Sequence, residues 1–168
     1  MRRWMLLVWW LAAPAAAQQI LIPMDAYQTD HLKAYGVAYW ALSQGVDVDW
    51  LLNYRGGAFL LQDFPGLQAE LRIRGVAFEA IDDATAARIL AEVEAEDRNT
   101  AVVRLEKAPR IAVYAPPYAQ PWDDAVMLAL NYAEVPYDRI YDDEVLSGEL
   151  EKYDWLHLHH EDFTGQYG

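Results

Sequence analysis

Residues 110–159, RIAVYAPPYAQPWDDAVMLALNYAEVPYDRIYDDEVLSGELEKYDWLHLH, decide the fold expected for this chain. Residues 110–115, 137–141 and 153–159 are expected to be strands, and a helical pattern over 123–133 separates the first two. Strands that alternate with helices need crossover connections, which produce parallel sheets with helices on both faces. The segment therefore predicts an α/β fold with a mainly parallel sheet.

The first half of the chain continues this alternation. A loop is expected at 53–57, where two glycines adjoin, and 59–61 is expected to begin a short helix. The other expected strands are 20–24, 46–52, 76–81 and 101–105, and the other expected helices begin at Thr29 or Asp30, at Pro65 and at Asp82 or Asp83. Together they predict one domain over 18–168, with a possible subdivision near 99–109.

The first 17 residues have the three parts of a secretory signal peptide. Arg2 and Arg3 are positively charged, 4–11 is an unbroken apolar stretch, and 12–17 consists of small residues and one proline. The apolar stretch is much shorter than the roughly 20 residues that span a bilayer. We therefore expect cleavage after Ala17, export to the periplasm or the extracellular space, and no membrane anchor in the mature protein.

Charge and cysteine content narrow the expected partners. Without the signal peptide the chain carries 11 basic and 26 acidic residues, a formal charge of −15. Such a surface repels phosphate backbones and anionic headgroups, so nucleic acid is not expected as a partner. The sequence contains no cysteine, which excludes disulfides, thiolate metal sites and a cysteine nucleophile within it. The expected partner is a small polar ligand or an envelope protein, and the oligomeric state stays open.

Polar residues at the end of the last expected strand are the first site candidates. In an open parallel sheet, ligands bind at the carboxyl ends of the strands, where His159, His160, Glu161 and Asp162 follow. His157 and His159 alternate with leucines and therefore face one side. With a carboxylate they are weak zinc candidates, because imidazole and carboxylate are normal zinc ligands. Two alternatives remain, a hydrogen-bonded histidine pair and a histidine that acts as acid or base.

A second group of ligand-binding candidates follows the first two expected strands. Asp25, Gln28 and His31 come after the first, and Asn53 and Arg55 come after the second. A parallel sheet would bring these residues to the same edge as the terminal histidines. Arg55, beside two glycines, offers a guanidinium group to a carboxylate or phosphate, or forms an ion pair with one of the many acidic residues.

Two sets of motifs resemble known families. Residues 110–157, with a Leu-spacer-Tyr-Asp phrase at 150–154, are similar to the opening of the class I glutamine amidotransferase-like (flavodoxin-like) fold. The blocks MDAYQTDHLKAYG (24–36), WLLNYRGG (50–57) and HHEDFTGQYG (159–168) resemble an exported bacterial family often labelled asparagine synthetase B. The first resemblance implies a sheet that continues beyond Gly168, so the chain is expected to be truncated at its C-terminus.

The resemblance implies amide hydrolysis or transfer, with a nucleophile beyond Gly168. The label itself fits poorly, because the glutamine-dependent synthetases have an N-terminal cysteine and a pyrophosphate-binding loop, and the chain has neither. Two hypotheses result. One is a binding module that lacks complete catalytic machinery, and the other is a fragment of an amidotransferase-like enzyme. Catalytic residues stay unassigned, and no cofactor is expected apart from the zinc alternative.

Overall fold

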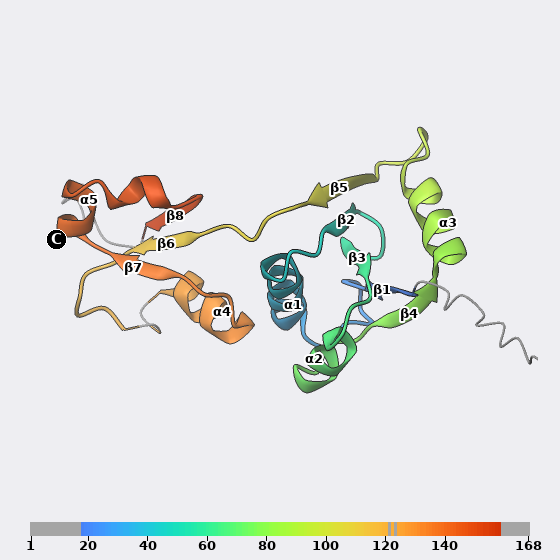
Figure 1. Ribbon diagram of the computed structural model, residues 1–168, viewed down its shortest axis with the longest axis horizontal. Coiled ribbons are helices and arrows are strands. Elements are labelled where there is room, and N and C mark those ends of the chain that lie inside the picture. The colour runs from blue at the N-terminus through green and yellow to red at the C-terminus, as the bar shows by residue number, and fades with distance from the viewer. Residues whose placement is uncertain (1–17, 121, 123, 159–168) are drawn as a thin grey trace, which may run out of the picture.

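The chain contains two sheets, one antiparallel and one parallel (Figure 1). The computed structural model describes residues 18–120, 122 and 124–158, so the predicted signal peptide lies outside the described residues. The larger sheet has the strand order β4-β1-β3-β2-β5, and the smaller has the order β7-β6-β8. We call 18–105 the antiparallel unit and 111–158 the parallel unit; residues 106–110 join them.

The elements of the antiparallel unit are β1 (Gln18–Ile22), α1 (His31–Ser43), β2 (Val48–Leu52), β3 (Ala58–Gln62), α2 (Leu67–Ile73), β4 (Glu79–Asp82), α3 (Asp83–Val93) and β5 (Ala101–Leu105). Those of the parallel unit are β6 (Ile111–Tyr114), α4 (Ala125–Ala133), β7 (Asp138–Ile140), α5 (Asp142–Leu146), the 3-10 helix η2 (Glu149–Lys152) and β8 (Trp155–Leu158). No helix in the described ranges is both long enough and apolar enough to cross a membrane.

The prediction of a mainly parallel, flavodoxin-like sheet is wrong. All four strand pairings of the larger sheet are antiparallel, and parallel pairing is confined to β6 with β7 and β8. The fold is therefore a mixed α/β arrangement that is mostly antiparallel.

The error comes from β3, which was expected to begin a helix. Four of its five residues are buried, so it is a continuous apolar run, and periodicity cannot distinguish such a run from a buried helix. The loop at 53–57 forms a hairpin that returns β3 beside β2, with left-handed backbone at Asn53, Arg55, Gly56 and Gly57. A Cβ atom at Gly56 would overlap the backbone of Met24, so glycine is required there. β3 then lies between β1 and β2, antiparallel to both.

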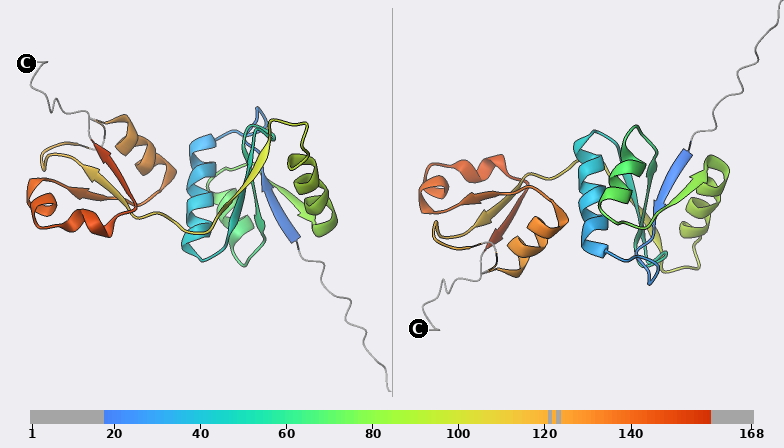
Figure 2. Two further views of the ribbon diagram at one scale, coloured as in Figure 1. Left: turned by 90° about the horizontal axis from the view of Figure 1, so that it is seen from above. Right: turned by 90° about the horizontal axis from the view of Figure 1, so that it is seen from below.

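The first six elements follow the split βαβ plan of ferredoxin-like folds. Their order along the chain is β1, α1, β2, β3, α2 and β4, and their order in the sheet is β4-β1-β3-β2. β5 extends the sheet by pairing with β2. Helices α1 and α2 cover one face and α3 lies on the other, as Figure 2 shows.

Side-chain alternation explains why both faces are covered. Ile20 and Ile22 face the α1 and α2 side, while Leu21 faces α3, and all three are buried. Helix α1 begins where the Asp30 side chain accepts a hydrogen bond from the Lys33 backbone N–H. The result is a sheet with an apolar core on each side.

The parallel unit is smaller and is organised around β6. On one face of β6, Val113 and Ala115 pack against Met127 of α4. Strand β8 pairs with β6 and has no strand on its other side in the described part of the chain. Trp155 is 44% exposed and Leu158 is 53% exposed, so β8 is covered much less than the strands of the antiparallel unit.

The two units contact each other through α1 and α4. A Cβ atom at Gly36 would overlap the carbonyl oxygen of Ala133, so glycine permits the close approach of the two helices. Lys33 Nζ lies 2.5 Å from Glu134 Oε1, and this ion pair holds the pKa of Glu134 below its usual value. The Tyr132 hydroxyl donates a hydrogen bond of 2.5 Å to Asp30 Oδ2.

Candidate functional site

The parallel unit contains a strand-order reversal, which is where open parallel sheets bind ligands. From β6 the chain passes through α4 to β7 on one side, and β8 then lies on the other side of β6. Connections that leave a strand toward opposite sides produce a crevice at the carboxyl ends of the strands. α4 begins at this edge, and the N-terminus of a helix carries partial positive charge.

Asp124 is the buried polar residue at this edge. It is 4% exposed and forms the N-cap of α4, accepting hydrogen bonds from the backbone N–H groups of Val126 at 2.7 Å and Met127 at 3.0 Å. Both of its carboxylate oxygens also lie 3.2 Å from Nε2 of His157. The helix cap thus fixes the carboxylate, and the carboxylate in turn fixes a histidine of β8.

His157 is oriented by this contact and remains accessible. Its side chain is 20% exposed, and it lies opposite Val113 in the β6–β8 register, on the face that α4 covers. An ionised carboxylate only accepts hydrogen bonds, so Nε2 carries the proton that faces Asp124. In the neutral ring, Nδ1 is then the nitrogen that accepts a proton or a hydrogen bond.

The Asp124 carboxyl is held in its ionised form. Burial opposes ionisation, but hydrogen bonds from the Met127 and Val126 N–H groups and from His157 outweigh it and lower the pKa of Asp124 to about 2. Asp124 is therefore negatively charged throughout the physiological range. A permanent charge beside Nε2 stabilises one orientation of the imidazole ring.

A cavity of about 320 Å³ lies at the same edge, beside β7. Arg139 and Glu144 are its charged residues, and Arg139 Nη2 donates a hydrogen bond of 2.6 Å to the carbonyl of Pro116. Tyr118 and Trp122, in the loop before α4, are highly exposed aromatic side chains. We call Asp124, His157 and this cavity the carboxyl-edge site.

The structure brings Asp25 and Arg55 together, at the edge where β1 and β2 end. β1 and β2 run in the same direction because β3 separates them, which is why their ends meet although the sheet is antiparallel. Arg55 Nε donates to Asp25 Oδ2 at 2.8 Å, and Arg55 also pairs with Glu79. The Asp25 side chain accepts from Arg55 and from the Tyr27 N–H, and these bonds lower its pKa.

The remaining described candidates form contacts that stabilise loops. Gln28 is buried, and its side-chain amide bonds the carbonyl groups of Pro23 and Ala77 and the backbone N–H of Ala77. His31 Nε2 lies 3.1 Å from the carbonyl oxygen of Met24. Asn53 Nδ2 donates to the carbonyl of Asn99 at 2.8 Å, toward β5 and away from Asp25. These partners are all backbone groups.

The terminal candidates His159, His160, Glu161 and Asp162 lie outside the described residues. Their expected position beside Asp25 and Arg55 depended on a single parallel sheet, whereas β8 belongs to the separate parallel unit. Zinc binding by His157 and His159 stays a prediction. Among residues 18–158 as described, no three His, Cys, Asp or Glu side chains are grouped so as to hold a metal ion.

Sequence reasoning missed Asp124 as a site residue. It interpreted 123–124 only as the start of a helix, which is its local role. A helix that begins at the carboxyl edge of a parallel sheet offers a sequence-level signal, because its N-cap then faces the ligand crevice. The partner on β8 could not be found from spacing, since 33 residues separate Asp124 from His157.

Comparisons with known proteins do not extend this description. No protein-family model, no curated protein and no solved structure matches the chain. The resemblance to the exported family labelled asparagine synthetase B stays a prediction, as do export and the signal peptide.

Proposed function

We propose that this protein binds a small polar ligand at the carboxyl-edge site, through Nδ1 of His157. The observation that supports the proposal is the contact of the buried, ionised Asp124 with Nε2 of His157. A carboxylate in this position fixes the ring and makes Nδ1 an acceptor for a hydroxyl, amide or ammonium proton. Arg139 and Glu144 of the nearby cavity add one donor group and one acceptor group.

Ligand binding fits these contacts better than amide hydrolysis or transfer. Nucleophilic catalysis needs a hydroxyl or thiol within hydrogen-bond reach of the histidine base. Within the described residues, the side-chain partner of the His157 ring is Asp124. The site as described thus has an oriented base but no nucleophile paired with it.

The proposal is tested by mapping where small polar probes bind the full chain. Acetamide, acetate and ethanolamine represent a neutral, an anionic and a cationic ligand, and backbone amide shifts in NMR spectra report the position of each. We expect acetamide, ethanolamine or both to shift the amide signals of Val126, Met127 and the β8 residues. His157→Gln should abolish these shifts, because glutamine cannot reproduce the oriented imidazole nitrogen.

His31→Gln is the matched control, because His31 is an exposed histidine of the antiparallel unit whose Nε2 lies 3.1 Å from a backbone carbonyl oxygen. Probe shifts that survive His157→Gln, or that respond equally to both substitutions, would refute the proposal. A response to acetate alone would indicate general anion attraction to the α4 N-terminus and would also count against it.

A further inference from the structure

The face of the antiparallel sheet under α3 is divided into an apolar half and a polar half. Leu21 and Leu51 belong to the apolar half and pack with α3. At the other end the same face carries Gln19 on β1, Gln62 on β3, Asp49 on β2 and Arg104 on β5. Gln19 is opposite Gln62 in the β1–β3 register, and Asp49 is opposite Arg104 in the β2–β5 register. Polar side chains are thus grouped across four neighbouring strands.

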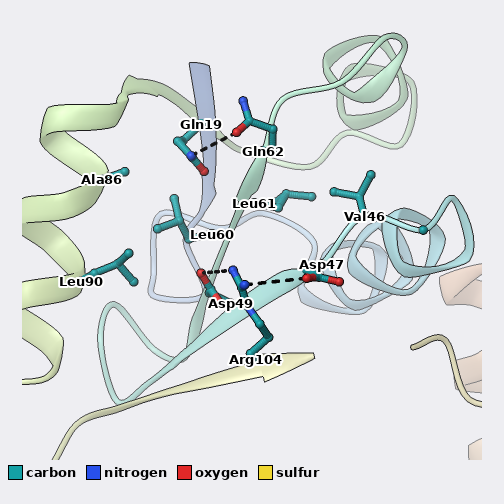
Figure 3. Close-up of a pocket in the computed structure, with 11 residues that line it drawn as sticks. Gln19, Val46, Asp47, Asp49, Leu60, Leu61, Gln62, Ala86, Leu90 and Arg104 are labelled. Atoms are coloured by element: carbon teal, nitrogen blue, oxygen red, sulfur yellow. Dashed lines mark hydrogen bonds and ion pairs between the residues drawn. The ribbon is translucent and has the colours of Figure 1, made fainter. Parts of the chain in front are cut away.

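The polar half borders a cavity of about 420 Å³, which we call the sheet cavity (Figure 3). Leu60, which lies between the polar pairs and is almost fully buried, and the partly exposed Leu90 of α3 are among the apolar residues that line it, as Figure 3 shows. A volume of this size lies within the roughly 300–1,000 Å³ of small-molecule sites. Apolar surface bordered by a few converging polar groups is also the usual composition of such sites.

The polar groups of the sheet cavity include both donors and acceptors. Arg104 donates to Asp49 through Nε at 3.0 Å and Nη2 at 3.4 Å, while its Nη1 lies 3.7 Å from Asp47, too far for a hydrogen bond. Gln19 Nε2 donates to Gln62 Oε1 at 3.4 Å and to Asp83 Oδ1 at 3.3 Å, both long bonds. Hydrogen-bonding capacity is left at Arg104 Nη1, at the Asp47 carboxylate and in these weak amide contacts.

The charge of the cavity restricts its ligand. Asp47 and Asp49 lie close to one guanidinium group, that of Arg104, and Gln19 bonds a third carboxylate, that of Asp83, so the local field disfavours anions. Because Arg104 itself bonds Asp49, a cation would have to compete with it. A neutral molecule whose groups both donate and accept matches the free donors and acceptors, and hydroxyl groups have this property.

We propose that the sheet cavity is a second binding site, which takes a neutral polyhydroxy compound of monosaccharide size. The C–H face of such a ring packs on the partly exposed Leu90, and its hydroxyl groups bond Arg104, Asp47 and the paired amides of Gln19 and Gln62. This site lies on the antiparallel unit and is independent of the carboxyl-edge site.

The test is calorimetric titration of the full chain with glucose, galactose and myo-inositol, alongside n-butanol, n-butylamine and butyrate. We expect millimolar or tighter binding of at least one polyol and none of the three butyl compounds. Amide shifts in β1, β2 and β3 should accompany binding. Gln62→Ala combined with Arg104→Gln should weaken the polyol roughly tenfold or more, because two or more hydrogen bonds are lost.

Gln44→Ala is the matched control, since Gln44 is an exposed glutamine at the end of α1 and does not line the cavity. It should leave polyol affinity unchanged, and so should His157→Gln. Absence of polyol binding would overturn the proposal, and so would butylamine or butyrate binding in its place. Equal effects of Gln44→Ala and the double variant would also overturn it. Circular dichroism establishes that each variant is folded before it is titrated.

Discussion

The antiparallel and parallel units differ in how completely their sheets are covered. In the antiparallel unit, three consecutive β1 residues, Ile20, Leu21 and Ile22, are buried, because helices pack on both faces. In the parallel unit, Trp155 and Leu158 of β8 remain about half exposed. The difference indicates that the antiparallel unit supplies most of the stabilising core, whereas the parallel unit keeps its carboxyl edge accessible.

The polar residues of the two units differ in the same way. Arg55 donates hydrogen bonds to both Asp25 and Glu79, so the charges of this group are paired with one another at the end of β1. Asp124 also bonds its neighbours, but it leaves Nδ1 of His157 as an oriented acceptor. Grouped polar residues thus indicate a site only when their mutual contacts leave a group directed toward a ligand.

Removal of the largest core side chain of β3 should have the largest effect. Phe59 is buried against Tyr35 and Trp50, so Phe59→Ala should lower the free energy of unfolding by about 3–5 kcal/mol. Leu158→Ala, on the exposed strand β8, should cost less than about 1 kcal/mol. Urea denaturation of both variants measures the difference. Equal losses would contradict the division into a stabilising core and an accessible edge.

A side chain at Gly36 should weaken the contact between the units. Gly36→Leu places atoms where the Ala133 carbonyl lies, at an expected cost of about 1–3 kcal/mol, although leucine favours a helix more than glycine does. Hydrogen exchange should become faster in α4 while β1 and β3 stay protected. Gly45→Leu is the comparison that measures backbone strain alone. A Cβ atom at Gly45 would meet no other atom, but the backbone there is left-handed. Unchanged exchange in α4 would contradict this interface.

Loss of the Asp124 charge should destabilise the parallel unit by roughly 1–2 kcal/mol, because the attraction between the carboxylate and the N-terminus of α4 and the contact with His157 both weaken. Asp124→Asn is the variant, and thermal unfolding near pH 7 is the measurement. The pKa of Asp124 is about 2 in the folded state, below the unfolded value of about 3.9. Its stabilising contribution is therefore present above about pH 4 and is lost as the pH falls toward 2.

Comparison with Asp124→Asn isolates the pH-dependent contribution of Asp124 from those of the other carboxylates, since the pKa of Asp154 is also lowered to about 2. The difference in stability between wild type and Asp124→Asn should shrink steadily between pH 5 and 2. A difference that stays constant over this range would show that the carboxylate charge is unimportant at this position.

The smallest effect is expected from the Lys33–Glu134 ion pair, one of two that Glu134 forms with the antiparallel unit; the other is with Arg74. Glu134 is half exposed, so Lys33→Met should cost no more than about 1 kcal/mol and less at high salt. Denaturation at low and high salt measures this loss. A loss well above that of Gly36→Leu would mean that charge, and not close helix packing, holds the units together.

Most elements could be predicted from sequence, because capping residues and apolar periodicity are local signals. Asp30 and Asp82 cap α1 and α3 as expected. The strand orientation of the larger sheet could not be predicted once 59–61 was expected to begin a helix, since β3 separates β1 from β2 and makes the pairing antiparallel. An apolar run of four residues without alternation carries no signal for either structure.

The candidate site was only partly predictable for a related reason. Placing polar residues at strand ends identified Asp25 and Arg55 as neighbours, and the two do form an ion pair. Such residues either use all their hydrogen-bonding groups on one another or leave one group available to a ligand. Side-chain geometry decides between the two, and the spacing of residues along the sequence does not determine that geometry. His157 was recognised as a strand-end residue, but its partner Asp124 depends on how α4 is placed against β8.

The orientation of the His157 ring tests the central claim most directly. Nitrogen-15 NMR of the ring at about pH 8, with Asp124→Asn for comparison, distinguishes the two neutral tautomers. We predict that wild-type His157 carries its proton on Nε2 and has an unprotonated Nδ1, and that Asp124→Asn loses this preference. A proton on Nδ1 in the wild type, or the same averaged signals in both proteins, would contradict an imidazole oriented by Asp124 for ligand binding.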